Sequence, residues 1–536
     1  MTRRISVRAC VIALCVCEIV AATASARVGM GDPVEPWREK KPDQLFLLHG
    51  HLRLRPALYQ NLDLDRGPSS DGSFLWPAGA TDLDLTTGGD LRLRISPSIF
   101  LSDEARVFVE IDVLDNVALG ARPRFTPFEG RTGIVAGTPF QEPLTALDGA
   151  FAVRTAMGEV LTPFGVLSAG RMPSHFGLGI GANAGDSIDD DLGDRADRVA
   201  FVAPLFGHYV AAALDVGASG PAGPSAFGGG AGLGPLPRNP LVSEQAISLA
   251  LLKFRAPWEV EAYRKEGYVV VDYGLATAIE WQVNDVPGFY QDFDAELGLD
   301  PDAVVYRGYT GGVADGWLRI VSGMFRFEAE AIVTAFHYDN ASPFAGVLLR
   351  QPVEGLPWGF AAVLELKPDP QWSVLTEIGA ASADDAPGFP LAAPTTLSGA
   401  RQGDVFGPQL DGTKDSRLDS FRLHPLHKVD LILWRTLLGG VSEAAFARAQ
   451  TTFAPAKGIT FEGNAIYSHA LSAVSAPGGV NPLGIEVDAA ATVETGGFSL
   501  RADVGLLLPL GGLGTRAPTL PATPATMALL RFGYAF

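Results

Sequence analysis

The last ten residues of the chain, Met527 to Phe536, alternate between two sets of side chains. Counting back from the terminus, the first set is Phe536, Tyr534, Phe532, Leu530 and Ala528, and the second is Ala535, Gly533, Arg531 and Leu529. Because a strand points successive side chains to opposite faces, this period of two predicts a β-strand with one aromatic and aliphatic face. Such a face must be buried in a core or presented to an apolar solvent.

The first 26 residues predict a secretory signal peptide. A cluster of arginines precedes an apolar run from Ala9 to Ala22, and Ala24 and Ala26 supply the small residues that a signal peptidase needs. We expect cleavage after Ala26, followed by a polar periplasmic tail over residues 27–43. All three cysteines lie within the predicted signal peptide, so we expect the mature chain to have neither disulfides nor thiolate metal sites.

Composition narrows the class of protein further. The chain has 41 Lys+Arg against 60 Asp+Glu, a formal net charge of −19, which makes nucleic acid a poor partner. Nothing after residue 26 reads as a transmembrane helix, and 62 glycines and 39 prolines interrupt the apolar stretches. This composition favours many strands joined by turns.

The first predicted strands carry the same alternation as the C-terminus. The predicted strand Leu45 to Gln60 contains the run Gly50 to Arg55 (G-H-L-R-L-R), and a second strand repeats it from Gly89 to Arg94 (G-D-L-R-L-R). A third strand sets four apolar residues between Val107 and Val113 against mainly charged ones. One apolar and one charged face is the pattern of a barrel wall between lipid and a wet lumen.

The connections between predicted strands alternate between short turns and long segments rich in Gly, Pro and Asp. This pattern predicts an all-β fold over residues 44–536: a transmembrane antiparallel up-and-down β-barrel of about 18 strands, with 16 to 20 as the range. Parity bears on the strand-like segment Val429 to Arg435, because one extra crossing would leave the C-terminus on the outer side. We therefore place it in the long loop 382–442, folded inward as a plug or paired locally; a hairpin there would give about 20 strands.

The C-terminal strand resembles the closing strand of bacterial outer-membrane barrels. The resemblance implies that Leu530, Phe532, Tyr534 and Phe536 form the assembly signal read by the barrel-assembly machinery. It also implies transport by periplasmic chaperones and a final location in the outer membrane of a Gram-negative bacterium, in contact with lipid and lipopolysaccharide. Association into a homotrimer stays open.

Several motifs resemble those of an uncharacterised family of porin-like outer-membrane β-barrels of myxobacterial type. They are Leu91–Arg94 followed by Ile111–Asn116, Gly170–Pro173 with Gly177–Gly179, Gly193–Arg198, and Phe421–Pro425 leading into Val429–Leu433. The resemblance extends over nearly the whole mature chain, and the role of that family is inferred from its fold. The chain departs from the family pattern at Ser187 and Asp190, where cysteines are expected, so a loop disulfide common there would be absent.

Counting by twos along each strand gives a set of charged residues for the inner face. The expected lumen-lining residues are Arg53, Arg55, Arg92, Arg94, Arg106, Glu110, Asp112, Asp272, Glu280, Glu328, Glu330, Glu365, Glu377, Glu486 and Asp488. The early strands are mainly basic and the later ones mainly acidic, which would set up a transverse field that orients polar solutes. The alternative is that these charges form ion pairs that fill and stiffen the interior.

One Asp-rich loop is a weak candidate for binding a cation. Asp186, Asp189, Asp191 and Asp194 offer the hard oxygen ligands that Ca²⁺ prefers, but their spacing lacks a regular ligand pattern, and a solvated loop is the favoured interpretation. The histidines are scattered and no Gly-x-Ser-x-Gly element accompanies them, so we expect neither an enzyme nor a cofactor.

The sequence therefore predicts a porin-like channel for passive diffusion of small polar or charged solutes. The main alternative is a plugged, non-conducting barrel that acts as a surface receptor or structural protein, and an outer-membrane hydrolase is less favoured. A lumen filled by the 382–442 loop would favour the plugged barrel.

Overall fold

The fold is known from a computed structural model, which describes residues 45–65, 85–119, 151–191, 193–216, 245–255, 257–285, 305–340, 352–383, 417, 419–473, 476, 478–514 and 521–536. The predicted signal peptide with Ala24 and Ala26, the predicted tail 27–43, and residues 384–416 of the predicted long loop lie outside the described residues.

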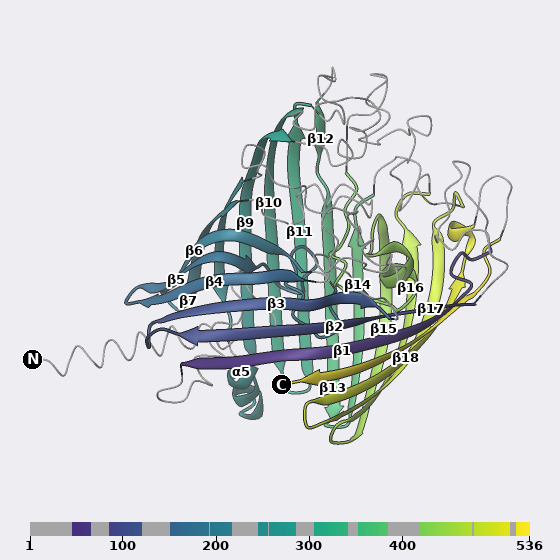
Figure 1. The fold of residues 1–536 in the computed structure, drawn as a ribbon. Coiled ribbons are helices and arrows are strands. Elements are labelled where there is room, and N and C mark those ends of the chain that lie inside the picture. The colour runs from purple at the N-terminus through teal and green to yellow at the C-terminus, as the bar shows by residue number, and fades with distance from the viewer. Residues whose placement is uncertain are drawn as a thin grey trace, which may run out of the picture.

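Antiparallel strands that follow one another in the chain form a single sheet (Figure 1). They are β1 (Phe46–Gln60), β2 (Leu85–Phe100), β3 (Ala105–Ala118), β4 (Ala152–Thr162), β5 (Gly165–Pro173), β6 (Arg195–Leu205), β7 (His208–Val216), β8 (Gln245–Lys253), β9 (Val270–Asp285), β10 (Val305–Ser322), β11 (Phe325–Tyr338), β12 (Val353–Gly355), β13 (Trp358–Asp369), β14 (Trp372–Ala381), β15 (Ala444–Ala456), β16 (Ile459–Ala470), β17 (Pro482–Thr495), β18 (Phe498–Pro509) and β19 (Ala525–Ala535). β1 pairs with both β2 and β19, so the sheet closes into a barrel.

The barrel wall has 18 strands, which confirms the predicted number. β12 and β13 both pair with β11, at Phe336–Tyr338 and Phe325–Val333 respectively, and together make one interrupted strand. The strand-like segment 429–435 is not part of the wall. It lies in the connection between β14 and β15, as the parity argument requires.

The outside of the barrel is apolar because the side chains alternate as predicted. On β8, Ile247, Leu249 and Leu251 are exposed by 44–55%, whereas Ala250 and Leu252 on the other face are buried. An 18-stranded antiparallel barrel with such an exterior is the architecture of outer-membrane proteins.

Among the described residues, no helix has the length and apolar character needed to cross a membrane. The α-helix within the described part of the chain is α5 (Pro257–Lys265), in the connection between β8 and β9. The other helical turns are the π-helix η4 (Leu433–Leu438) and the 3-10 helix η5 (Gly511–Leu513).

The closing seam of the barrel is completed by the last residue of the chain. The backbone of Phe536 exchanges two hydrogen bonds of 3.0 Å with that of Gly50 on β1. The Phe536 ring covers Gly50 on the outer face, since a Cβ there would lie 2.6 Å from Cζ of the ring. Phe532, Tyr534 and Phe536 are all exposed on that face. Their role in assembly, together with that of Leu530, stays a prediction.

Among the described residues, two connections from the long-loop end of the barrel fold into the lumen. Inner loop 1 is residues 174–191, 193 and 194, between β5 and β6, and inner loop 2 is residues 419–443, before β15. Inner loop 2 contains η4, visible in Figure 1 as the green helical turn beside β16. The short turns between strands lie at the opposite end, which we call the short-turn end.

Candidate functional site: the filled lumen

The arginines predicted on the first three strands point into the lumen but are covered. The side chains of Arg53 and Arg92 are 0% exposed and that of Arg94 is 2% exposed. Arg94 forms a double hydrogen bond with Asp112 at 2.7 and 2.9 Å, and Arg106 lies 2.6 Å from Glu159 on β4. In this conformation the arginines are part of a packed ionic network rather than an open water-filled wall.

Strand register places two like charges directly opposite each other. Arg53 on β1 pairs with Arg92 on β2, whereas Arg55 pairs with Asp90. Like charges opposite one another on a sheet destabilise it unless an anion lies between them. Asp191 of inner loop 1 supplies that anion: its Oδ1 is 2.8 Å from Arg53 and 3.6 Å from Arg92.

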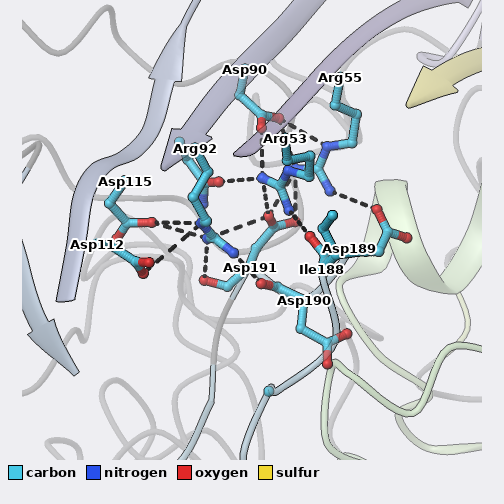
Figure 2. A network of polar contacts seen from close by, with 12 residues as sticks. Arg53, Arg55, Asp90, Arg92, Asp112, Asp115, Ile188, Asp189, Asp190 and Asp191 are labelled. Atoms are coloured by element: carbon cyan, nitrogen blue, oxygen red, sulfur yellow. Dashed lines mark hydrogen bonds and ion pairs between the residues drawn. The ribbon is translucent and has the colours of Figure 1, made fainter. Parts of the chain in front are cut away.

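Inner loop 1 is attached to this wall by its tip, as Figure 2 shows. Arg55 contacts both Asp189 at 3.4 Å and Asp191 at 2.8 Å. Arg53 also donates to the carbonyl of Ile188 at 3.1 Å, and Arg92 donates to the carbonyls of Asp190 and Asp191. Backbone and side chains of the tip thus both accept from the arginines.

Electrostatics explains why the tip stays charged. Burial by itself would raise the pKa of the Asp189 carboxyl, but Arg435, Lys428, Arg55 and Arg531 hold it well below its usual range. Asp191 behaves in the same way: burial acts to raise its pKa, and Arg55, Arg53 and Arg92 lower it further than burial raises it. Both groups are therefore carboxylates at neutral pH.

The later strands carry the predicted acids, most with a cation close by. Asp272 binds Arg319 at 2.6 Å and Arg255 at 2.9 Å, and Glu377 binds His427 at 2.8 Å and Arg448 at 3.1 Å. The remaining contacts are Glu110 with Arg154 and Arg195, Glu328 and Glu365 with Arg326, Glu280 with the Tyr309 hydroxyl, and Glu330 with the backbone N–H of Gly179.

Inner loop 2 fills the opposite side of the lumen with apolar side chains. Trp434 is 1% exposed, and its indole N–H donates to Ser468 on β16 at 2.9 Å. Its buried neighbours pack with the inward residues Leu507, Met527 and Leu529 of the wall. The loop residues of this core are Phe421, Leu423, Val429, Leu431, Ile432, Leu433, Trp434, Leu437, Leu438 and Val441.

Two carboxyl groups hold the backbone of inner loop 2. Glu486 on β17 accepts from the N–H groups of residues 431, 432 and 433 at 2.6–2.9 Å. Asp430 accepts from the N–H groups of Trp434 and Arg435 at 3.0 Å. Burial, and secondarily the charge of Glu486, raises the pKa of Asp430 well above its usual range. Asp488 lies beside this pair, 7% exposed.

The two inner loops meet at Asp189. Arg435 and Lys428 of inner loop 2 lie 2.6 and 3.6 Å from its Oδ2, and Arg531 on β19 lies 3.2 Å from the same atom. A second contact joins His424 to Asp194 at 3.3 Å. The loops therefore form one continuous filling across the lumen.

Sequence analysis missed several members of this network. Asp90, Asp115 and Glu159 place acids among the arginines, so the basic wall carries its own counter-charges and the separation into basic and acidic walls is weaker than expected. The same count by twos would have found Asp90 and Glu159. Lys428, Arg435 and the inward course of both loops have no periodic pattern that would reveal them.

The Asp-rich loop differs from its favoured interpretation as a solvated outer loop. Asp189, Asp191 and Asp194 are bound by arginine, lysine or histidine inside the barrel, and Asp186 lies 3.8 Å from Arg195. Within the described part of the chain, no group of three or more His, Cys, Asp or Glu residues is arranged to hold a metal ion. At Ser187 and Asp190, two hydrogen bonds of 2.9 and 3.0 Å close the turn where the family resemblance expects a disulfide.

Charged side chains nearer the short-turn end are more accessible to water. Glu462 on β16 and Arg501 on β18 are 20–21% exposed, although they bind each other at 2.7 Å. The lumen is therefore polar and partly wet below inner loop 2.

Comparisons with solved structures find other outer-membrane proteins. OpdK of Pseudomonas aeruginosa, solved with vanillate, matches with 9% identity and a TM-score of 0.45 over 91% of this chain and 98% of that one. OccK11 (OpdR) of the same organism matches with 9% identity and a TM-score of 0.43 over 92% of this chain and 97% of that one. The channel DcaP of Acinetobacter baumannii matches with 11% identity and a TM-score of 0.38 over 92% of this chain and 97% of that one. No family model and no curated protein matches the sequence. A likeness at these values concerns the barrel and carries no functional argument.

Proposed function

We propose that the protein is a porin-like channel of a Gram-negative outer membrane, through which small polar or charged solutes diffuse passively. The observation that carries this proposal is the charged inner face of a closed 18-stranded barrel, part of which water reaches. A water-filled path for polar solutes needs polar or charged groups on its wall.

The inner loops restrict the path that solutes can take. Arg53, Arg92 and Arg94 are covered by inner loop 1, so no solute passes along them in this conformation. The partly exposed Glu462 and Arg501 mark the side where solutes enter from the short-turn end, which we assign to the periplasm. Expected partners are the surrounding lipid and lipopolysaccharide, the periplasmic chaperones and the barrel-assembly machinery.

One observation favours the second candidate, a plugged non-conducting barrel. Residues 419–443 fill the lumen with a continuous apolar core, and inner loop 1 is joined to it through Asp189. A barrel that stays in this state would act as a surface receptor or a structural protein.

Single-channel recording of purified, folded protein in planar bilayers separates the two candidates. Discrete current steps are expected for a channel, and their absence from verified folded protein would leave the plugged barrel. In a KCl gradient, Arg501→Ser should shift the reversal potential toward cations, because one positive charge leaves the wet part of the inner face. Arg171→Ser, a side chain 47% exposed and paired with Asp197, is the matched control and should leave the potential unchanged.

A further inference from the structure

The contact between the two inner loops brings together six cations from three parts of the chain. They are Arg53, Arg55 and Arg92 of the β1–β2 wall, Lys428 and Arg435 of inner loop 2, and Arg531 of β19, and we call them the cation cluster. The side chains of Arg53 and Arg92 are fully covered, and those of the other four are 11–21% exposed.

Half of the cluster depends on a loop for its counter-charge. Arg53 and Arg55 have Asp90 on the wall, and Arg92 has Asp115. Among the described residues, the ion-pair partners of Lys428, Arg435 and Arg531 all belong to inner loop 1. If the tip of inner loop 1 moved away, these three largely covered cations would lose every such partner.

Three carboxylates of inner loop 1 contact the cluster: Asp190 binds only Lys428, at 2.9 Å, and the other two, Asp189 and Asp191, lie close together. Arg55 reaches Asp189 with one terminal nitrogen and Asp191 with the other, so a single guanidinium separates them. Asp189 Oδ2 contacts Arg435, Arg531 and Lys428, while Asp191 lies between the like charges of Arg53 and Arg92 (Figure 2). Two carboxylates at that separation resemble the two ends of a short dicarboxylate.

We propose that the cation cluster is a binding site for a compact dianion of the size of a short dicarboxylate, and that Asp189 and Asp191 occupy it as a tethered substitute. A free dianion that reaches the cluster replaces the two carboxylates, keeps the cations paired and releases inner loop 1 from the wall. The inference deepens the proposed channel function, on which its consequence for transport rests, by naming a solute class and the event that opens the lumen.

The tethered carboxylates set how strongly a free dianion must bind. A group held on a short loop competes at an effective concentration in the mM range or above. The wild-type protein should therefore bind a dicarboxylate weakly, and removal of the two loop charges should expose the site.

The first test measures binding of sodium succinate to purified, folded protein by isothermal titration calorimetry. Asp189→Asn/Asp191→Asn should bind succinate at least about tenfold more tightly than wild type, because the internal competitor has lost its charge. Asp186→Asn/Asp197→Asn also removes two negative charges but from positions outside the cluster, and should bind as wild type does. Adding Lys428→Gln and Arg435→Gln to the first variant should abolish the gain.

Two companion ligands test the chemistry of the site. Acetate at equal ionic strength has one carboxylate and should bind far more weakly than succinate. Inorganic phosphate separates a general oxyanion site from one with the span of a dicarboxylate, and phosphate binding tighter than succinate would overturn the dicarboxylate assignment. Equal succinate binding by the cluster variant and its charge-matched control would overturn the site itself.

A second test uses wild-type charges and does not depend on the folding of the aspartate variants. Ala184 in inner loop 1 is 1% exposed, and Ala184→Cys reports release of the loop through its maleimide labelling rate. Succinate should accelerate labelling more than acetate at equal ionic strength, and equal rates would overturn the proposal. Bilayer currents are a separate measurement. Succinate binding without any current would overturn the channel function but not the binding site. Current without succinate binding would overturn the binding site but not the channel function.

Discussion

Inner loop 1 is held in the lumen by ion pairs, whereas inner loop 2 is held mainly by apolar packing. The first presents Asp189 and Asp191 to arginines of the wall, and the second buries Trp434 and its neighbours against β16 to β19. Ion pairs must be matched in charge and can be exchanged for another anion, but an apolar core is lost only by exposing it to water. The difference makes inner loop 1 the element that a solute can displace, and inner loop 2 the fixed part of the filling.

The largest effect should come from the apolar side of this comparison. Trp434→Ala removes a fully buried ring and should cost about 3–5 kcal/mol of the free energy of unfolding. Denaturant unfolding of the barrel in lipid measures the loss, and maleimide labelling of Thr436→Cys reports local release of η4. Trp434→Phe keeps most of the volume and loses the hydrogen bond to Ser468, so it should cost about 1 kcal/mol. Equal losses in the two variants would mean that packing does not hold this loop.

A smaller effect is expected on the charged side. Arg55→Gln removes the group that contacts both Asp189 and Asp191 and should weaken the attachment of inner loop 1 by about 1.5–3 kcal/mol. Labelling of Ala184→Cys should rise roughly 10- to 150-fold, while labelling of Thr436→Cys should change little. The exposed pair Arg171–Asp197 is the control, since Arg171→Gln should cost about 0–1 kcal/mol. Release of both loops together would show that they form one cooperative unit.

The two loops should also respond differently to pH. The pKa of Asp430 is raised by burial and by Glu486, with Asp488 adjacent and Arg448 opposing the shift. A group with a raised acid pKa binds its proton more tightly in the folded state, so stability falls as pH rises above the ordinary value of 3.8, by at most about 1.4 kcal/mol per pH unit. Inner loop 2 should loosen as the pH rises from about 4 to the raised pKa of Asp430 in the folded protein.

Inner loop 1 should show no such response over the same range. The pKa of Asp189 is depressed, so its contribution to stability is present above the ordinary value of 3.8 and is lost only in stronger acid. The measurement is the maleimide labelling rate of Thr436→Cys and of Ala184→Cys as a function of pH. Each rate is divided by the rate of the same variant carrying Asp430→Asn, which cancels the pH dependence of the thiol's own reactivity. Parallel pH curves for the two positions would contradict the assignment of Asp430 to inner loop 2 alone.

The smallest effect concerns salt. Raising NaCl from about 0.1 to 1 M shortens the Debye length from about 10 to 3 Å, but ion pairs this deeply buried are screened only weakly. Labelling of Ala184→Cys should increase by about two- to threefold and that of Thr436→Cys should stay constant. A rise at Thr436→Cys of the same size would mean that charge also holds η4 in place.

Much of the wall could be read from the sequence because its physics is local. The predicted strand Leu45 to Gln60 is found as Phe46–Gln60, and the repeat Gly89 to Arg94 lies on β2, as predicted. Side chains of each strand alternate between the outside and the inside, and turns separate the strands, so the number of 18 follows from counting turns. The parity of that count also kept residues 429–435 out of the wall.

The filling of the lumen could not be read in the same way. Asp189 reads as one of several acids in a Gly- and Asp-rich loop, and nothing in the residues around it indicates Arg435 as its partner, 246 positions away. Lys428 and Arg531 likewise belong to segments that only the closed barrel brings together. Alternation along β1 and β2 places their arginines on the inner face but does not indicate that a loop covers them.

The sequence by itself determined that the chain forms a closed barrel with charges inside. Alternation along a strand is set by neighbouring residues, and closure of the barrel is set by the pairing of its first and last strands. Tertiary structure decided what occupies the inside. Inner loop 1 lies on the wall because Arg53 and Arg92 face each other and require an anion, and inner loop 2 lies opposite because its apolar residues find Leu507, Met527 and Leu529 there. Both choices depend on charges and surfaces that become neighbours only after the barrel has closed.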